Sequence, residues 1–446
     1  MAIILAGEIK IQKVLIRFLS PKALLLAGFL LFFTIVSTAS AAQQAQIVSD
    51  AQAVFGQFSD NIVKIQVVEN GSGAKAVIGS GFFATADGHI ITNYHVISKQ
   101  VHYPERYRTE FVDSSGSPNP VSIIGIDVIN DLAIIHAKIK TAHYFKLASV
   151  DIKQGVRLYS LGFPHDIGLT IVEGTYNGFL KYALYKKIHF TGSINPGMSG
   201  GPTITALGNV VGVNVSSAGE QVGFLVPVDA VLKLLSAALK QPNTDSKKLL
   251  EAVRSQLLLH QDSYISDNLI NMNDAVQLGK YRLPSKLASF FNCWADASRK
   301  EKELFQTVNH QCSTDDYIYI SSSQRSGIIQ FRHRLVTTDK LNRFRFYSLY
   351  SNFFNERYGS IYGSEEEVTK YKCETKTVDI KNISFKTTFC VRRYRKLEGL
   401  YDAVFKAAAL NENNSGLETT LVLSGVSFEN AVKLSKRYLE AISWKE

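Results

Sequence analysis

The stretch "INPGMSGGP", residues 194–202, places three glycines and two prolines around one serine, Ser199. A plain turn would explain one Gly-Pro pair, because glycine tolerates positive φ and proline presets a turn angle. It does not explain the whole segment. Flexible neighbours on both sides can hold a serine hydroxyl outward while backbone N–H groups converge near it, which is the geometry that an oxyanion needs. The segment therefore predicts a nucleophilic serine, and that chemistry requires a histidine and an acid elsewhere.

Two upstream segments supply the candidate histidine and acid. The segment "GSGFFATADGHIITNYHVI", residues 79–97, alternates like strands, turns at an Asp-Gly pair and brings His95 to a strand end. In "DVINDLAIIHAKI", residues 127–139, an apolar strand begins directly after Asp131. These residues lie tens of positions apart along the chain. Only tertiary folding can bring them together with the serine, as in convergent Ser-His-Asp triads.

The three segments resemble the trypsin-like serine proteases, in particular the Deg/HtrA branch that is common in bacterial envelopes. Residues 79–97 resemble the histidine region of that branch, "NDLAII" resembles its aspartate region, and "SINPGMSGGP" resembles its serine region. Residues 208–219 and 222–228 resemble the strands that follow the nucleophile. The resemblance covers roughly residues 47–240, under half of the chain.

The resemblance implies a role for each residue. Ser199 would be the nucleophile, His95 the general base and then general acid, and Asp131 the acid that orients the imidazole. The N–H groups of Gly197 and Ser199 would bind the oxyanion. Asp127 is the rival acid, but the aspartate of the family directly precedes the apolar strand, which favours Asp131. Because the triad and the oxyanion hole supply the whole mechanism, no metal ion or organic cofactor is expected.

Each of these segments also has an ordinary structural interpretation. A Gly-x-Ser-Gly-Gly segment is usually a flexible turn, a histidine in a strand is usually structural, and an Asp before a strand often caps a turn. The occurrence of all three in the order of the family favours a protease. We interpret His89 and His136 as structural. A catalytically silent or latent protease-like module, which binds substrates or acts as a chaperone, is the alternative function.

Four uncharged residues are expected to line the primary substrate pocket: Ser193, Ile194, Val215 and Ser217. A pocket without a carboxylate offers no partner to Lys or Arg, so small or medium apolar side chains are expected at the cleavage site. The substrate backbone would add in extended form along residues 211–217. Where the branch most often has a small polar residue, this chain has Met198, whose side chain is expected on the leaving-group side.

Basic residues precede a long apolar run at the N-terminus. Four of them come before the uncharged segment 23–42, in which Ala39 and Ala41 match a signal peptidase site. Residues 1–42 therefore predict a secretory signal peptide. An uncleaved inner-membrane anchor is the alternative, because the run approaches the roughly 20 residues that span a bilayer. In both cases the basic flank predicts export of the remainder to the bacterial periplasm or beyond the cell.

All four cysteines lie beyond residue 290: Cys293, Cys312, Cys373 and Cys390. Their spacings lack the close C-x-x-C pairs of zinc ribbons, and an exported protein favours disulfides. Three pairings are open. We favour the sequential one, which joins the first two and the last two cysteines and closes loops of about 20 residues, each worth roughly 3 kcal/mol in the chain-entropy model.

At 446 residues the chain is long for one hydrophobic core, so at least two domains are expected. We predict a mostly β protein with a trypsin-like double β-barrel protease domain at 43–240, closed by a helix at 227–240. A helical connecting region would follow at 241–311, and an α+β domain on an antiparallel sheet at 312–446. The Deg/HtrA branch normally continues into PDZ-type modules, but no glycine-rich carboxylate-binding loop follows residue 240.

Two arginine pairs stand out in the predicted C-terminal strands: Arg332 with Arg334, and Arg343 with Arg345. Residues two apart in a strand share one face, so a basic face could dock an anionic envelope component, with a solvated outer face as the alternative. Nucleic acid is not expected despite the net charge of +10, because no nucleic-acid motif is present. The expected partner is a protein or peptide substrate, with membrane contact only through an uncleaved N-terminal segment.

Overall fold

The computed structural model describes residues 50–269, 272, 274–298, 303–314, 316–321, 323–356 and 362–444. The expected signal peptide or anchor at 1–42 lies outside this range. Among the described residues, no helix combines the length and the apolar character needed to cross a membrane. Every element discussed below belongs to one compact unit within residues 58–446.

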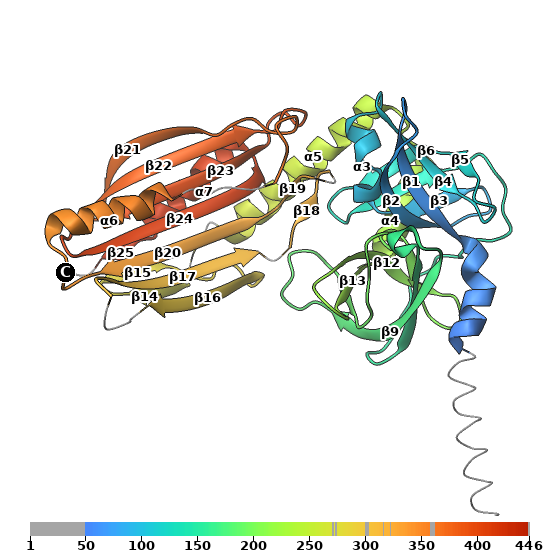
Figure 1. Cartoon of the computed structure of the whole chain (residues 1–446), viewed down its shortest axis with the longest axis horizontal. Helices are drawn as coiled ribbons and strands as arrows, with labels where there is room; N and C mark the ends of the chain where they lie inside the picture. Colours follow the sequence, from blue (N-terminus) through green and yellow to red (C-terminus); the bar gives the residue numbers. More distant parts are fainter. Residues whose placement is uncertain are drawn as a thin grey trace, which may run out of the picture. The chain divides into compact units, whose positions relative to one another are not determined.

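The first seven strands form one antiparallel sheet, in the order β5-β4-β1-β2-β3-β7-β6 (Figure 1). They are β1 (Ile62–Glu69), β2 (Lys75–Phe83), β3 (His89–Thr92), β4 (Tyr107–Val112), β5 (Pro118–Pro120), β6 (Ser122–Asp127) and β7 (Leu132–His136). Strands β1, β3 and β7 have runs of consecutive buried residues, so the alternation that the sequence suggested is not seen in their burial.

Helix α3 (Tyr94–His102) begins two residues after β3 and carries His95 in its first turn. The prediction that His95 ends a strand is therefore wrong. Tyr94, Ile97 and Val101 recur at helical spacing and are buried in the core of the first sheet, so this short segment buries more apolar surface as a helix than as a strand extension.

Six further strands form a closed barrel, in the order β10-β13-β12-β11-β8-β9. Met198 is fully buried in the core of this barrel together with Ile194 and Phe190. The expectation that Met198 points to the leaving-group side is wrong, because its unbranched apolar chain fills the barrel interior. The strands are β8 (Arg157–Gly162), β9 (Thr170–Phe179), β10 (Ile188–Phe190), β11 (Pro202–Ile204), β12 (Val210–Ser217) and β13 (Gly223–Pro227).

Two helices follow the barrel. Helix α4 (Val228–Lys240) lies where a closing helix was predicted, with Pro227 as its N-cap. Helix α5 (Ser246–Tyr264) begins after Asp245, whose carboxylate accepts hydrogen bonds from two backbone N–H groups of the first turn. It buries leucines and a valine in one apolar cluster with residues of β6 and of the segment 397–400, so α5 packs against both the first sheet and the C-terminal region.

After α5 and a short helical segment at Ile265–Leu269, the described part of the predicted helical connecting region contains four strands. These are β14 (Ala275–Leu278), β15 (Tyr281–Pro284), β16 (Phe291–Ser298) and β17 (Gln306–Thr314), so the prediction for 241–311 is wrong beyond α5 and the sheet begins before residue 312. Helix-favouring Ala, Leu, Lys and Glu residues suggested a helix here. Pairing of β16 with β17 and burial of Phe291 override that weak local preference.

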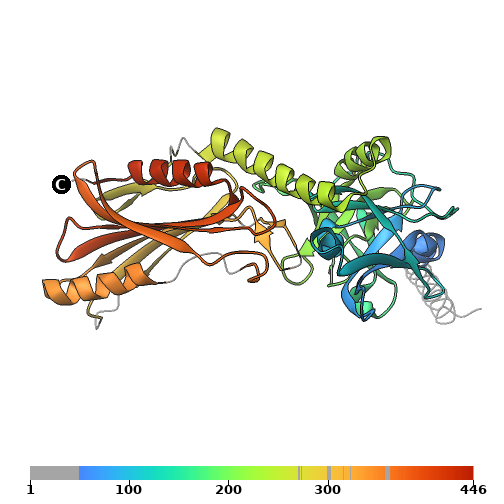
Figure 2. The ribbon, with the colours of Figure 1, turned by 90° about the horizontal axis from the view of Figure 1, so that it is seen from above.

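The C-terminal region is built on a seven-stranded antiparallel sheet, in the order β16-β17-β20-β24-β23-β22-β21. Helix α7 (Phe428–Glu440) and helix α6 (Arg343–Asn355) cover opposite faces of this sheet, as Figure 2 shows. The long strands are β20 (Ile329–Thr337), β21 (Lys372–Ile380), β22 (Ile383–Arg393), β23 (Tyr401–Ala409) and β24 (Ser415–Val426), and short strands are β18 (Ile318–Tyr319), β19 (Arg325–Ser326) and β25 (Ser443–Trp444). The prediction of a mostly β protein is confirmed.

The basic face predicted for this sheet does not form. Arg343 and Arg345 lie in helix α6, where residues two apart point to different sides, because Phe346, Tyr350 and Phe354 recur at helical spacing and bury that segment as a helix. Arg332 and Arg334 do lie in strand β20. Their guanidinium groups form ion pairs with two carboxylates, those of Glu356 and Glu418, so this face is not an open basic patch.

The structure has the sequential disulfide pairing. Cys293–Cys312 joins β16 to β17, and Cys373–Cys390 joins β21 to β22, in each case between residues directly opposite in the register. Strands β16 and β21 are the two edges of the seven-stranded sheet. Each disulfide therefore fixes an edge strand to its neighbour, where an edge would otherwise be free to separate or to pair with another chain.

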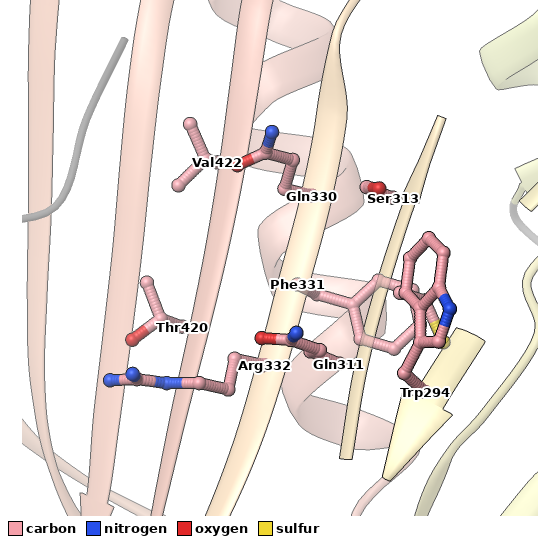
Figure 3. A pocket seen from close by; sticks show the side chains of 9 residues that line it. Trp294, Gln311, Ser313, Gln330, Phe331, Arg332, Thr420 and Val422 are labelled. Atoms are coloured by element: carbon pink, nitrogen blue, oxygen red, sulfur yellow. The ribbon is translucent and has the colours of Figure 1, made fainter. Parts of the chain in front are cut away.

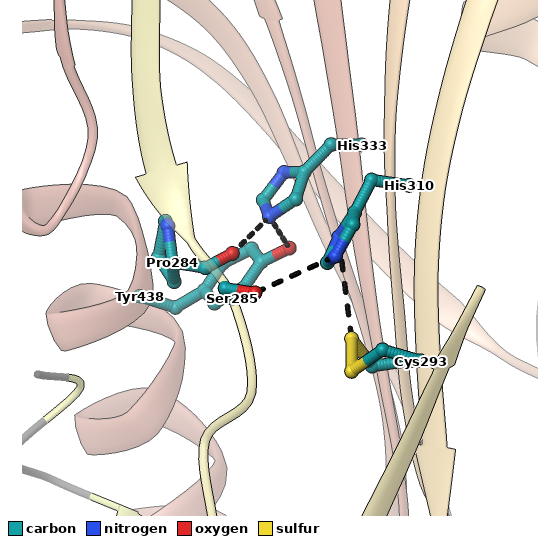
Figure 4. The surroundings of a disulfide bond; sticks show 7 residues. Pro284, Ser285, Cys293, His310, His333 and Tyr438 are labelled. Atoms are coloured by element: carbon teal, nitrogen blue, oxygen red, sulfur yellow. Dashed lines mark hydrogen bonds between the residues drawn. A yellow bond between two sulfur atoms is a disulfide. The ribbon is translucent and has the colours of Figure 1, made fainter. Parts of the chain in front are cut away.

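Near the first disulfide, the His333 side chain is fully buried (Figure 4). Its Nε2–H donates to the Pro284 carbonyl oxygen at 2.8 Å, and its Nδ1 lies 2.9 Å from the Thr419 hydroxyl. Burial lowers the pKa of His333 to about 3, so the folded protein keeps this imidazole neutral at pH values where an unfolded chain would protonate it.

Acid should therefore destabilise the protein through His333. Because the unfolded state binds the extra proton, the free energy of unfolding should fall by up to about 1.4 kcal/mol per pH unit from about pH 6.5 downward. Urea unfolding followed by tryptophan fluorescence between pH 7 and pH 4.5 measures this slope. The variant His333→Gln should show a shallower slope, and an unchanged slope would contradict the assignment.

Candidate active site

His95 and Asp131 form a short, oriented pair. The Nδ1 atom of His95 lies 2.6 Å from Oδ2 of Asp131, and the backbone N–H of His95 donates to Oδ1 at 2.8 Å. Asp131 is buried and His95 is partly exposed. Since both carboxylate oxygens engage the same residue, the imidazole is held with Nδ1 toward the acid, which leaves Nε2 to face a reacting group.

Backbone contacts fix the position of Asp131. This residue sits between β6 and β7 with a φ of 55°, an uncommon value for a residue other than glycine. Its carbonyl oxygen accepts hydrogen bonds from the Asn93 side chain at 2.7 Å and from the Tyr94 N–H at 3.2 Å. The carboxylate of Asp127, the rival acid, instead accepts two hydrogen bonds from Asn130 and caps the turn.

The glycines around Ser199 have a structural reason. Gly197 and Gly200 have φ values of 99° and 87°, in the left-handed region that L-residues with a side chain rarely adopt. A Cβ atom would clash with the Phe163 carbonyl oxygen at the first position and with the Ser80 carbonyl oxygen at the second. This close approach to the segment after β8 and to strand β2 requires glycine on each side of the serine.

Ser80 ties the serine loop to the sheet that carries the histidine. Its backbone N–H donates to the Ser199 carbonyl oxygen at 2.8 Å, and its hydroxyl donates to the Gly197 carbonyl oxygen at 2.7 Å. The same hydroxyl accepts from the Phe163 N–H at 2.9 Å, and Thr92 donates to the Ser80 carbonyl oxygen at 2.7 Å. Ser80 was not predicted as a functional residue, although its two flanking glycines in "GSG" are consistent with a close backbone contact.

The serine loop leaves several polar groups available. Within the described part of the chain, neither the N–H of Gly197 nor that of Ser199 donates a hydrogen bond, and the Ser199 hydroxyl has no partner either. Catalytic contacts to a nucleophile are often long before substrate binds and shorten in the complex. The two N–H groups therefore remain candidates for binding an oxyanion.

The four predicted pocket residues occupy different environments. Ile194 belongs to the core of the closed barrel, and Val215 is also buried. Ser193 is half-buried and Ser217 is exposed at the end of β12. Strand β11 pairs with β12 only as far as Val213, so the segment 215–217 has no strand on that side among the described residues.

Two further histidines lie in the strands of the first sheet. His89 and His136 stack with ring centroids 4.6 Å apart, and their partners are Thr85 and the Asp87 carbonyl oxygen. Burial, followed by the neighbouring His136, lowers the pKa of His89. These contacts fit the structural interpretation of both residues.

An aromatic residue from far along the sequence covers the candidate histidine. The ring of Tyr319, in strand β18, lies over the ring of His95 with centroids 4.7 Å apart and planes inclined by 35°. The sequence analysis predicted the strand that holds Tyr319 but gave no indication of this contact.

Two features of the C-terminal sheet lie outside the candidate site. One is a cavity of about 190 Å³ whose lining includes Trp294, Gln311 and Arg332, from the adjacent strands β16, β17 and β20 (Figure 3). The other is the group Cys293, His310 and Cys312, whose side-chain atoms lie close enough together to hold a metal ion. Both sulfurs are bonded to each other there, so they are not thiolate ligands.

Comparisons with known proteins match the region that contains the candidate site. Residues 79–213 match the family model of the trypsin-like peptidase domain. A probable periplasmic serine endoprotease, DegP-like, of Chlamydia pneumoniae is 31% identical over 164 residues, which cover 34% of this chain and 32% of that protein. Serine protease HTRA1 of Xenopus tropicalis is 28% identical over 179 residues, which cover 38% of each chain.

One solved structure also matches part of this chain. The serine endoprotease from Yersinia pestis is 22% identical with a TM-score of 0.37, covering 43% of this chain and 66% of that chain. The chain spans about a third of the length of the two curated relatives above, 32% and 38%. The similarity to these relatives therefore extends over part of each protein and not over its whole length.

The contacts of Ser80 predict a positioning role. The variant Ser80→Ala leaves the Gly197 carbonyl oxygen and the Phe163 N–H without this partner, so the loop around Ser199 should lose its fixed geometry. Loss of about 1 to 1.5 kcal/mol corresponds to roughly a tenfold slower reaction of Ser199 with a fluorophosphonate probe. The variant Ser115→Ala, in an exposed turn, is the control. Equal labelling rates for both variants, with folding verified by circular dichroism, would refute the role.

Proposed function

We propose that this chain, whose residues 79–213 form a trypsin-like peptidase domain of the Deg/HtrA type, is a serine endopeptidase that hydrolyses proteins. The observation that carries the proposal is the oriented His95–Asp131 pair, in a site whose glycine-flanked serine loop leaves two N–H groups open. The two curated relatives described above are named as serine proteases, which supports the same reaction class.

In the first step, the Ser199 Oγ attacks the carbonyl carbon of the scissile peptide bond. A new C–O bond forms, the carbonyl π electrons move to oxygen, and His95 Nε2 takes the hydroxyl proton. Asp131 keeps Nδ1 protonated and stabilises the positive imidazolium that results. Without the base, a serine hydroxyl is a weak nucleophile at neutral pH.

The negative oxygen of the tetrahedral intermediate would be bound by the N–H groups of Gly197 and Ser199. Loss of one such donor typically raises the barrier by about 3 to 4 kcal/mol. Collapse of the intermediate breaks the C–N bond, and the imidazolium of His95 gives its proton to the leaving amine. Water then hydrolyses the acyl-enzyme by the same proton transfers in reverse, and Ser199 is released.

The substrate would bind in extended form along residues 215–217 of β12. This segment has an unpaired side because β11 ends its pairing at Val213, so main-chain groups there can add a peptide strand. Of the predicted pocket residues, Ser193, Val215 and Ser217 are uncharged. We therefore propose small or medium apolar residues at the cleaved position rather than Lys or Arg.

Replacement of the nucleophile tests the function directly. The variant Ser199→Ala should abolish casein cleavage and fluorophosphonate labelling, whereas Ser115→Ala should retain both. The variant Asp131→Asn should keep the fold and lower the cleavage rate about 10⁴-fold, the size of the corresponding effect in the trypsin triad, because the imidazole loses its fixed tautomer. Casein cleavage by Ser199→Ala at the wild-type rate would rule out the proposed mechanism.

We further propose that the protein is exported and acts in quality control of envelope proteins. The supporting observations are the basic-apolar pattern of residues 1–42 and the periplasmic location in the name of the Chlamydia pneumoniae relative. Intact-mass measurement of the protein from a periplasmic fraction should give an N-terminus at residues 41–43. Recovery of the full-length chain in the cytosolic fraction would contradict export.

A further inference from the structure

The β18–β19 hairpin of the C-terminal region reaches the candidate active site. Besides the contact of Tyr319 with the His95 ring, Tyr317 packs edge-on against Tyr319 with ring centroids 5.1 Å apart. The guanidinium group of Arg325, in the second strand of the hairpin, lies over the rings of Tyr317 and Tyr319 at 4.1 and 5.6 Å. The two tyrosines and the arginine thus form one stack beside the histidine.

The hairpin is held in this place by the helix that carries His95. The carbonyl oxygen of Ile320 accepts hydrogen bonds from the Tyr94 hydroxyl and from His102 Nε2, each at 2.9 Å. Ile318 and Ile320 are buried in the same apolar cluster as Tyr94. These contacts are buried on both sides, so Tyr319 is a fixed part of the site and not the tip of a free loop.

An extended substrate along residues 215–217 would place alternate side chains on opposite sides. If the side chain of the cleaved residue enters the pocket beside Ser199, the side chain of the residue before it points the other way, toward the ring of His95. That is the position of Tyr319. Tyr319 also lines a small space beside Asp131, Val215 and Ser216, with a volume of about 20 Å³, so its ring leaves little room where the hairpin meets β12.

We propose that Tyr319 is a specificity-determining residue, which restricts the substrate residue directly before the cleaved one to glycine or alanine. The inference rests on the proposed function and adds to it a subsite wall supplied by the C-terminal region. A larger side chain at that substrate position would have to displace the ring of Tyr319, and with it the contacts to Tyr317 and Arg325.

The test uses the full-length protein and a series of peptides that differ only at this position, with Gly, Ala, Val, Leu or Phe. For the wild type, kcat/KM should fall at least about tenfold from Ala to Leu, in the range that one or two misfitting methylene groups cause. The variant Tyr319→Ala should remove that difference by accelerating cleavage of the bulky peptides. The variant Tyr319→Phe keeps the ring and should keep the preference, as should Phe344→Ala, which removes an exposed ring elsewhere.

Several results would overturn the inference. Equal acceleration of all five peptides by Tyr319→Ala would mean that the hairpin blocks the whole cleft, and equal loss on all five would mean that Tyr319 positions His95. If Tyr319→Ala does not fold, Tyr319→Leu gives the same comparison. A wild type that is labelled by fluorophosphonate at Ser199 but cleaves the Ala and Leu peptides equally refutes this inference alone. A wild type without labelling refutes the proposed function and this inference with it.

Discussion

The close approach of the serine loop to strand β2 is the constraint on which the candidate site depends. Ser80 contacts this loop through its N–H and its hydroxyl, and Thr92 fixes the Ser80 carbonyl oxygen from the neighbouring strand. The loop belongs to the closed barrel, whereas β2, β3 and the helix with His95 belong to the first sheet. Gly200 is needed because any side chain would separate the two. We therefore propose that a few hydrogen bonds at this junction set the position of Ser199 relative to His95.

Sequence motifs indicate the candidate residues, but the contacts that hold these residues and their loops in place could not be predicted from the sequence. Ser199, His95 and Asp131 follow from motifs that local residue types define, and those motifs recur in one order. Ser80 and Asn93 donate hydrogen bonds to backbone carbonyl oxygens of residues distant in the sequence. Every residue type has such an oxygen, so the sequence gives no indication of these contacts. The contact of Tyr319 with His95 spans more than 200 positions, and nothing near either residue indicates the other.

The wrong predictions of helices and strands have physical causes, which two segments illustrate. The segment 287–305 contains helix-favouring Ala, Leu, Lys and Glu residues, yet within it the pairing of Cys293 with Cys312 and the burial of Phe291 require a strand. Residues 343–350 alternate in charge and aromaticity, which suits a strand, but Phe346, Tyr350 and Phe354 also fit a helix and bury that face. When one segment fits both the two-residue period of a strand and the period of a helix, tertiary packing determines which structure forms.

The C-terminal region is integrated with the region that contains the candidate site. Helix α5 contributes to one apolar cluster with residues of β6 and of segment 397–400, and the β18–β19 hairpin adds Ile318 and Ile320 to the same cluster. Because this packing also positions Tyr319, the C-terminal region contributes to the surroundings of His95. The disulfides that fix both edges of the C-terminal sheet would then preserve the site indirectly.

The central claim is that Ser199 is acylated through His95, and trapping of the covalent intermediate tests it most directly. The full-length protein would react briefly with the p-nitrophenyl ester of an alanine derivative, followed by acid quench, digestion and mass spectrometry of the peptides. The account predicts one acyl group, on the peptide that contains Ser199, and none in a His95→Ala variant. Acylation at another residue, or equal acylation of Ser199 in the variant, would contradict it.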